Sequence, residues 1–84
     1  MKKRLAKSLY TERWELLRSK LKDMRKERGL TQADVAKLLN RPQSLVAKIE
    51  SGERKLDVCQ FLDYLEVLEA DPIEVVRALT KKNE

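Results

Sequence analysis

The stretch Gly29–Gly52, GLTQADVAKLLNRPQSLVAKIESG, decides the fold. It predicts two short helices joined by a tight turn. The hydroxyl of Thr31 can accept a backbone N–H at the start of the first helix, and Asp34, three residues on, completes a capping pattern. Asn40 tolerates a left-handed backbone, and Pro42 pushes the residue before it out of the helical region, so the first helix ends there.

The second helix of this stretch begins at about Gln43 and ends at Gly52. Val46 and Ile49 recur at helical spacing and predict its inner face. The outer face carries small or polar side chains without an acid, namely Gln43, Ser44, Ala47 and Lys48. That composition suits a helix that lies in the major groove of DNA, where base edges offer hydrogen-bond donors, acceptors and methyl groups.

Composition restricts the class of protein. The chain has 84 residues, of which 42% are hydrophobic, so it can form one small domain with a modest core. A single cysteine allows no intramolecular disulfide, and the absence of histidine argues against a structural zinc site. The sequence has neither a signal peptide nor an apolar run of membrane-spanning length. We therefore expect a soluble cytoplasmic protein that has no membrane contact, cofactor or metal.

Charge is polarised along the chain. Residues 1–28 contain 11 basic and 4 acidic residues, whereas residues 56–84 contain 3 basic and 7 acidic ones. A basic N-terminal half indicates an anionic partner, and an acidic C-terminal half indicates a face that is kept away from it. The alternative is the ordinary solvated surface of a lysine-rich protein.

The N-terminal segment divides into an arm and a long helix. Residues 1–7 are expected to form a basic flexible arm or a frayed extra turn of helix. The arm would either reach phosphates or a minor groove or serve as a solubilising tail. The first helix starts at about Ser8 or Thr11 and ends at Arg28. Its apolar stripe consists of Tyr10, Trp14, Leu17, Leu21 and Met24. The outer part of this stripe, Tyr10 and Trp14, packs either on the last helix or on a second subunit.

The loop after Gly52 carries Arg54 and Lys55, which are candidate phosphate ligands because a loop after a recognition helix often lies over the DNA backbone. Their alternative is ordinary loop charge. A fourth helix starts near Asp57, and its predicted inner stripe is Val58, Phe61, Leu62, Leu65 and Leu68. Tyr64 falls off the centre of that stripe.

A fifth helix is predicted from Pro72 to about Thr80, with Asp71 as its N-cap and proline at its first position. Its expected inward residues are Ile73, Val76 and Leu79, while Val75 is expected on the outside.

Over Leu17–Leu79 the chain resembles the XRE, or lambda-repressor-like, helix-turn-helix family of DNA-binding regulators. The residues that carry the resemblance are Gly29–Gln32, Ala36, Gln43–Ser44 and Ile49–Arg54. The resemblance implies an all-α, five-helix DNA-binding domain over residues 8–81, here with an extended first helix and with the helix-turn-helix at about residues 31–51.

The resemblance also implies roles for individual residues. The expected base contacts are Gln43, Ser44, Lys48 and Ala47, the last by touching a thymine methyl. By the resemblance Gln32 would bind a phosphate, and we expect Arg41, Arg54 and Lys55 to do the same. Arg25 and Glu50 match a pair that forms an internal salt bridge between the first and third helices. An acid on the DNA face would repel phosphate, so we expect Glu50 to be structural.

The predicted function is that of a sequence-specific transcriptional regulator, expected to be a repressor, which binds a palindromic operator in double-stranded DNA as a homodimer. The candidate dimer contacts are Val75, Val76, Leu79, Trp14 and Tyr10, with the intramolecular core as the alternative for all of them. Another possibility is an antitoxin or restriction–modification controller that acts partly through a toxin or other protein partner. An enzyme is not expected, because histidine, a Gly-rich phosphate loop and a nucleophile motif are all missing.

Overall fold

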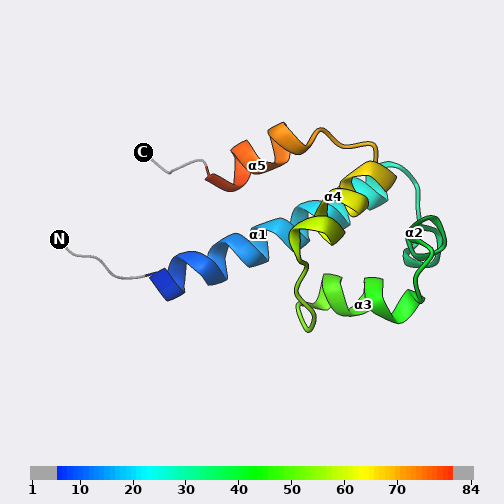
Figure 1. The fold of residues 1–84 in the computed structure, drawn as a ribbon, viewed down its shortest axis with the longest axis horizontal. Coiled ribbons are helices and arrows are strands. Elements are labelled where there is room, and N and C mark those ends of the chain that lie inside the picture. Colours follow the sequence, from blue (N-terminus) through cyan, green and yellow to red (C-terminus); the bar gives the residue numbers. More distant parts are fainter. Residues whose placement is uncertain (1–5, 81–84) are drawn as a thin grey trace.

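A computed structural model describes residues 6–80, and all of its secondary-structure elements are helices (Figure 1). The helices are α1 (Ala6–Glu27), α2 (Gln32–Leu39), α3 (Gln43–Ser51), α4 (Val58–Val67) and α5 (Pro72–Thr80). No strand occurs in this described part of the chain. The predicted all-α, five-helix architecture is therefore confirmed.

Helix α1 is longer than the sequence pattern indicated. It begins at Ala6, so Ala6 and Lys7 belong to a helix and not to an arm, while residues 1–5 of the predicted arm lie outside the described residues. Arg25 and Lys26 in its last turn complement the negative end of the helix dipole. Gly29 then takes a left-handed backbone with φ 71°, which turns the chain toward α2.

The caps of the helix pair explain its boundaries. The Thr31 hydroxyl accepts a hydrogen bond from the Asp34 backbone N–H at 3.0 Å, and the Asp34 carboxylate accepts one from the Thr31 N–H at 2.8 Å. These bonds lower the pKa of Asp34. Asn40 is left-handed, with φ 59°, and Pro42 precedes α3 without a side-chain cap. Each boundary follows from a local property of its residue.

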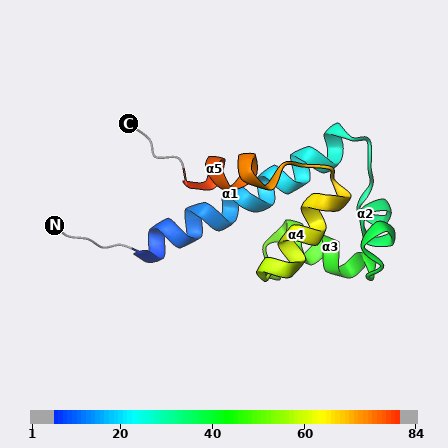
Figure 2. The same ribbon diagram turned by 45° about the horizontal axis from the view of Figure 1, so that its top comes forward.

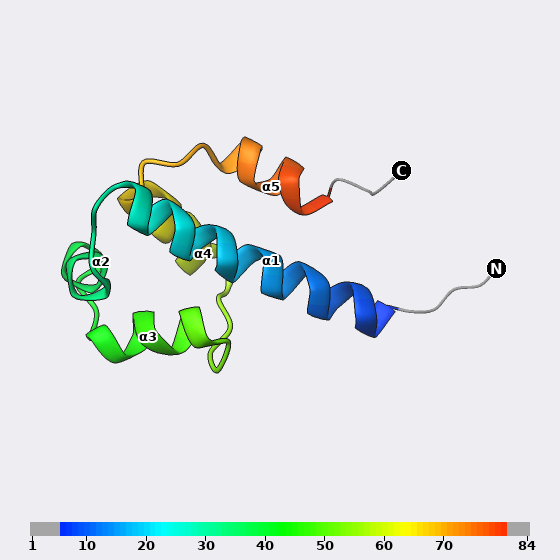
Figure 3. The same ribbon diagram turned by 180° about the vertical axis from the view of Figure 1, so that it is seen from behind.

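The core lies where the five helices meet. Its fully or nearly fully buried apolar residues are Leu21, Val35, Ala36, Val46, Ile49, Tyr64, Leu65, Leu68 and Val75. Seen from behind, α1 crosses in front of α4 (Figure 3). Helix α5 contacts α1 and runs beside it in the opposite direction (Figures 1 and 2). Every helix thus contributes to one core.

The buried face of α4 shares Phe61, Leu65 and Leu68 with the predicted stripe but is rotated relative to it. Val58 is 71% exposed and Leu62 is 47% exposed, whereas Tyr64, expected off the stripe, is 1% exposed. The residues that pack inward are Phe61, Tyr64, Leu65 and Leu68. Their i, i+3, i+4, i+7 spacing satisfies a helical period as well as the predicted set does, so spacing alone could not choose between the two stripes.

The predicted orientation of α5 is wrong for Ile73, Val75 and Val76, although Leu79 packs inward as predicted. Val75 is buried, with 6% exposure, while Ile73 and Val76 are 65% and 45% exposed. The inward face is formed by Val75 together with the half-buried Leu79, because α5 packs along α1 with that side. Val75 is therefore a core residue and is withdrawn as a candidate dimer contact.

Among residues 6–80, no helix combines the length and apolar character that crossing a bilayer requires. Within the same residues, no group of three or more His, Cys, Asp or Glu side chains could hold a metal ion. The only cysteine of the chain, Cys59, is exposed on α4.

Candidate nucleic-acid interface

Helix α3 presents two distinct faces. Its inward residues Val46 and Ile49 have 0% and 1% of their surface exposed, and they hold the helix against the core. The opposite side exposes Gln43, Ser44 and Lys48, three of the predicted base contacts. In Figures 1 and 3 this helix lies along one edge of the molecule, on the far side of α1 from α5. The predicted face is therefore available to a large partner.

Ala47, the fourth predicted base contact, is half-buried. Its methyl group lies at the border between the exposed face and the core-facing side of α3. A small side chain at this position lets another surface approach the helix closely. Its only chemistry is apolar contact, as a thymine methyl would require.

The predicted pair of Arg25 and Glu50 is present and joins α1 to α3. The Arg25 Nε and Nη2 atoms donate to the two Glu50 carboxylate oxygens at 2.6 and 3.0 Å, a two-point geometry. Arg25 Nη1 also donates to the backbone oxygen of Leu30 at 2.8 Å, just before α2. The guanidinium thus joins the end of α1 to the residue before α2 and to the end of α3.

Gln32 enlarges this pair into a network that the sequence did not indicate. Its side-chain Nε2 donates to Glu50 at 2.9 Å, so one amide N–H of this predicted phosphate ligand is used internally. The amide has a second N–H, which this hydrogen bond leaves available. Gln32 is half-buried at the first position of α2.

The network also determines how Glu50 ionises. Burial of the carboxyl disfavours its charged form, but the hydrogen bonds from Arg25 and Gln32 outweigh burial and lower the pKa of Glu50. The hydrogen bond to Glu50 in turn raises the pKa of Arg25. Both groups are therefore charged at neutral pH and hold each other within the fold, as expected for a structural pair.

The three predicted phosphate-binding cations are placed differently. Arg54 is exposed directly after α3, and its backbone N–H donates to the Lys48 oxygen at 3.1 Å. Lys55 instead lies over two aromatic rings of α1, with its Nζ 5.5 Å from the centroids of Tyr10 and Trp14. Of these two neighbours, only Lys55 has its charge placed against aromatic side chains of α1.

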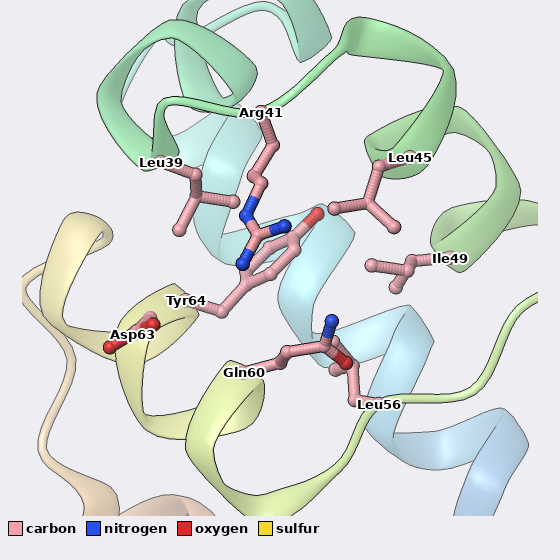
Figure 4. A pocket seen from close by; sticks show the side chains of 8 residues that line it. All are labelled: Leu39, Arg41, Leu45, Ile49, Leu56, Gln60, Asp63 and Tyr64. Atoms are coloured by element: carbon pink, nitrogen blue, oxygen red, sulfur yellow. The ribbon is translucent and has the colours of Figure 1, made fainter.

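Arg41 extends from the α2–α3 turn toward α4 (Figure 4). It lines a small cavity of about 20 Å³ between the helix pair and α4. The other lining residues are Leu39, Leu45, Ile49, Leu56, Gln60, Asp63 and Tyr64. Arg41 itself is exposed, and its guanidinium lies on the α4 side of the turn.

The hydroxyl of Tyr64 is buried without a hydrogen-bond partner among the described residues. Burial, and then the nearby charge of Glu50, raises the pKa of Tyr64. The ring occupies the core beside the charged network. Its hydroxyl therefore stays protonated over the physiological pH range.

The acidic part of the chain runs from the N-cap of α4 to the first turn of α5. Between Asp57 and Val76 the sequence contains six acidic residues and no basic one. Helix α5, which carries part of this charge, lies across α1 from α3 (Figures 1 and 3). This separation keeps its negative charge from the exposed face of α3 and favours an anionic partner at that face.

Comparison with known proteins identifies the helix arrangement. A family model described as a helix-turn-helix domain matches residues 16–79. An XRE-family like protein from Pseudomonas syringae pv. tomato str. DC3000 is 37% identical and superposes with a TM-score of 0.83, over 87% of this chain and 89% of that one.

A point mutant of a restriction–modification controller protein superposes with a TM-score of 0.68, over 80% of this chain and 81% of that one. At 24% identity this second likeness concerns the fold alone. No curated protein sequence matches the chain.

Proposed function

This chain belongs to the XRE-like helix-turn-helix family of DNA-binding transcriptional regulators, and we propose that it is a repressor that binds a palindromic operator as a homodimer. The observation that carries the proposal is the exposed, acid-free face of α3, opposite the buried Val46 and Ile49. A helix held in this way can enter the major groove without disturbing the core.

Each exposed side chain of α3 suits a particular contact. Gln43 can hydrogen-bond to the N6 and N7 edge of adenine, and Lys48 can donate to O6 and N7 of guanine. Ser44 can bond to either kind of base edge, while Ala47 is suited to the thymine methyl. A good two-point contact discriminates between bases by about 1–3 kcal/mol. Sequence preference therefore depends chiefly on Gln43 and Lys48.

Affinity without sequence preference comes from groups around α3. Gln32, at the start of α2, retains an N–H for a phosphate, and Arg54 is exposed at the other end of the helix pair. Arg41 contributes by long-range attraction, because its guanidinium lies toward α4. A dimer that neutralises roughly 6–10 phosphates loses about 10³–10⁵-fold in affinity between 50 and 200 mM salt.

The homodimer is supported by exposed apolar residues on α4 and α5. Val58 and Leu62 on α4 share a face, as do Ile73 and Val76 on α5, and all four are exposed. Leu79 lies in a nearby groove of about 210 Å³ that Tyr10 and Trp14 also line. Two-fold symmetry then requires half-sites whose centres are about 34 Å apart.

The same groove favours a second candidate, an antitoxin or a restriction–modification controller that acts partly through a protein partner. Its apolar lining, which includes Trp14 and Leu79, is combined with the cationic side chains Arg13 and Lys55. An acidic, partly apolar partner segment would suit such a lining. In this candidate the partner modulates the regulator, and DNA binding through α3 is retained.

Selection of bound sequences from a random DNA pool tests the repressor proposal. We expect enrichment of a palindrome, and we expect Lys48→Met to relax the preference at one position of each half-site. Lys37→Met is a matched control, since Lys37 is an exposed lysine on α2. Enrichment of no palindrome, or an unchanged preference in the Lys48 variant, would contradict the proposed mode of binding.

A further inference from the structure

Helix α1 contacts the loop that follows α3 at two points, through Arg18 in its second half and through Tyr10 and Trp14 in its first half. At the start of that loop, the Arg18 guanidinium packs against Gly52. Three residues later, the Lys55 ammonium lies over the rings of Tyr10 and Trp14. Arg54, the candidate phosphate ligand, lies between these two points. Helix α1 therefore contacts the loop on both sides of Arg54.

The first contact depends on the glycine. Gly52 has φ 90°, and a Cβ added there would lie 2.8 Å from the Arg18 Cζ atom. The absence of a side chain thus lets the guanidinium reach the C-terminal end of α3, where the helix dipole favours a positive charge. The same guanidinium carbon is 6.0 Å from the centroid of Trp14. Arg18 and Trp14 together support the beginning of the loop.

The second contact involves two rings at once. The Lys55 Nζ is 5.5 Å from each centroid, within the range in which a cation is attracted to an aromatic face. Lys55 and its neighbour Leu56 also line the groove formed with Tyr10, Trp14 and Leu79. Across this groove, Arg13 Nε donates to the Leu79 oxygen at 3.2 Å and joins α1 to α5. The rings that receive Lys55 therefore line a groove whose two sides are joined by this hydrogen bond.

We propose that Lys55 is a positioning residue, held by Tyr10 and Trp14, which fixes the loop so that Arg54 contacts the DNA backbone. This inference rests on the proposed DNA-binding function and deepens it. Lys55 was expected to bind phosphate directly, but its ammonium is already attracted to two rings, and moving it away to a phosphate would give up that attraction. Arg54 has no such competing contact with an aromatic ring among the described residues, so it is the cation available to a phosphate.

The contact of Lys55 with the rings of Tyr10 and Trp14 is called the clamp below. Tryptophan fluorescence tests the clamp without DNA, since Trp14 is the only tryptophan in the chain. We expect Lys55→Met to shift the Trp14 emission, because the charge over the ring is lost, and Lys55→Arg to restore it. Arg54→Met is the matched control, which removes one neighbouring charge and is expected to leave the emission unchanged. Equal spectra for Lys55→Met and the wild type would overturn the clamp.

Binding to the selected operator, measured by fluorescence anisotropy over a range of salt, tests the positioning role. Arg54→Met should reduce the salt slope by about 0.9 per subunit, as for one lost phosphate contact. Lys55→Met should weaken binding when Arg54 is present, and should have almost no further effect in the Arg54→Met background. A further loss of about 0.9 in the slope of the double variant would show that Lys55 binds phosphate itself and would overturn the proposal.

The two proposals fail in different ways. If the wild-type chain bound no DNA, the proposed function and the positioning role would both be wrong, while a shift of Trp14 emission specific to Lys55 would still establish the clamp. If the wild type bound DNA normally, and the fold-losses in affinity of Arg54→Met and Lys55→Met multiplied in the double variant, only the positioning role would be wrong. Addition of operator DNA to the wild type should not reproduce the emission shift of Lys55→Met, because the clamp persists in the complex.

Discussion

Replacement of Glu50 by alanine should destabilise the domain strongly. Its carboxylate accepts two hydrogen bonds from Arg25 and one from Gln32. Only 4% of the Glu50 side chain and 9% of the Arg25 side chain are exposed, so water cannot replace the lost partner. Removing one member of a buried ion pair costs about 3–5 kcal/mol, because the other charge stays buried and unpaired.

The structure places the cost at the lower end of that range. Arg25 keeps its hydrogen bond to the Leu30 oxygen, so part of the guanidinium remains satisfied. A loss of about 3 kcal/mol corresponds to more than a hundredfold change in the unfolding equilibrium. In a domain of this size it lowers the melting midpoint by at least about 12 °C. Thermal unfolding followed by far-ultraviolet circular dichroism measures this shift.

Two further variants make the result specific. Glu53→Ala removes an exposed acid three residues away and should change stability by less than about 0.5 kcal/mol. The double variant Arg25→Met with Glu50→Leu should be more stable than Glu50→Ala, because no buried charge is left unpaired. If Glu50→Ala melted like Glu53→Ala while DNA affinity changed, Glu50 would act at the DNA surface and the structural assignment would be refuted.

Four other outcomes follow from the same structure. Because the pKa of Glu50 is lower in the folded state than its ordinary 4.5, its contribution to stability is present above that value and is lost as the pH falls below it; urea titrations of wild type and Glu50→Gln at several acidic pH values would detect this. Tyr64→Phe should leave stability unchanged or raised at neutral pH. Above pH 10 the unfolded wild type releases the Tyr64 proton, which the folded state keeps because of its raised pKa, so the wild type loses stability there and the variant should unfold less; alkaline titration followed by circular dichroism measures the difference. Thr31→Ala should cost about 1 kcal/mol in urea unfolding because α2 loses its cap, and serine should restore it. Val76→Glu should yield a folded monomer, judged by light scattering and circular dichroism, and a dimer that persisted would exclude this face of α5 from the interface.

The site was predictable to the extent that it depends on local chemistry. The caps at Thr31 and Asn40 define α2, and the spacing of Val46 and Ile49 orients α3, so the exposed positions of Gln43 and Lys48 could be assigned from the sequence. The pairing of Arg25 with Glu50 followed from the family resemblance and not from spacing. The role of Gln32 in that network could not be deduced, since its side chain could point to solvent or to Glu50 with the same sequence.

By itself, the sequence determined where α2 and α3 begin and end and which face of α3 is exposed, because caps, turns and helical period act within a few residues. It did not determine the start of α1, which lies at Ala6. Only the tertiary structure decided which of two equally spaced stripes of α4 is buried and which side of α5 faces inward, since both depend on how these helices dock on the rest of the domain. It also decided the placement of Lys55, which is 41 residues from Trp14 in the chain but lies over its ring. Contacts over such distances arise from packing between helices, and no local pattern encodes them. The stretch Gly29–Gly52 thus encodes the helix pair whose exposed face we propose to bind DNA, while packing between helices places the loop after α3 against Tyr10, Trp14 and Arg18 of α1.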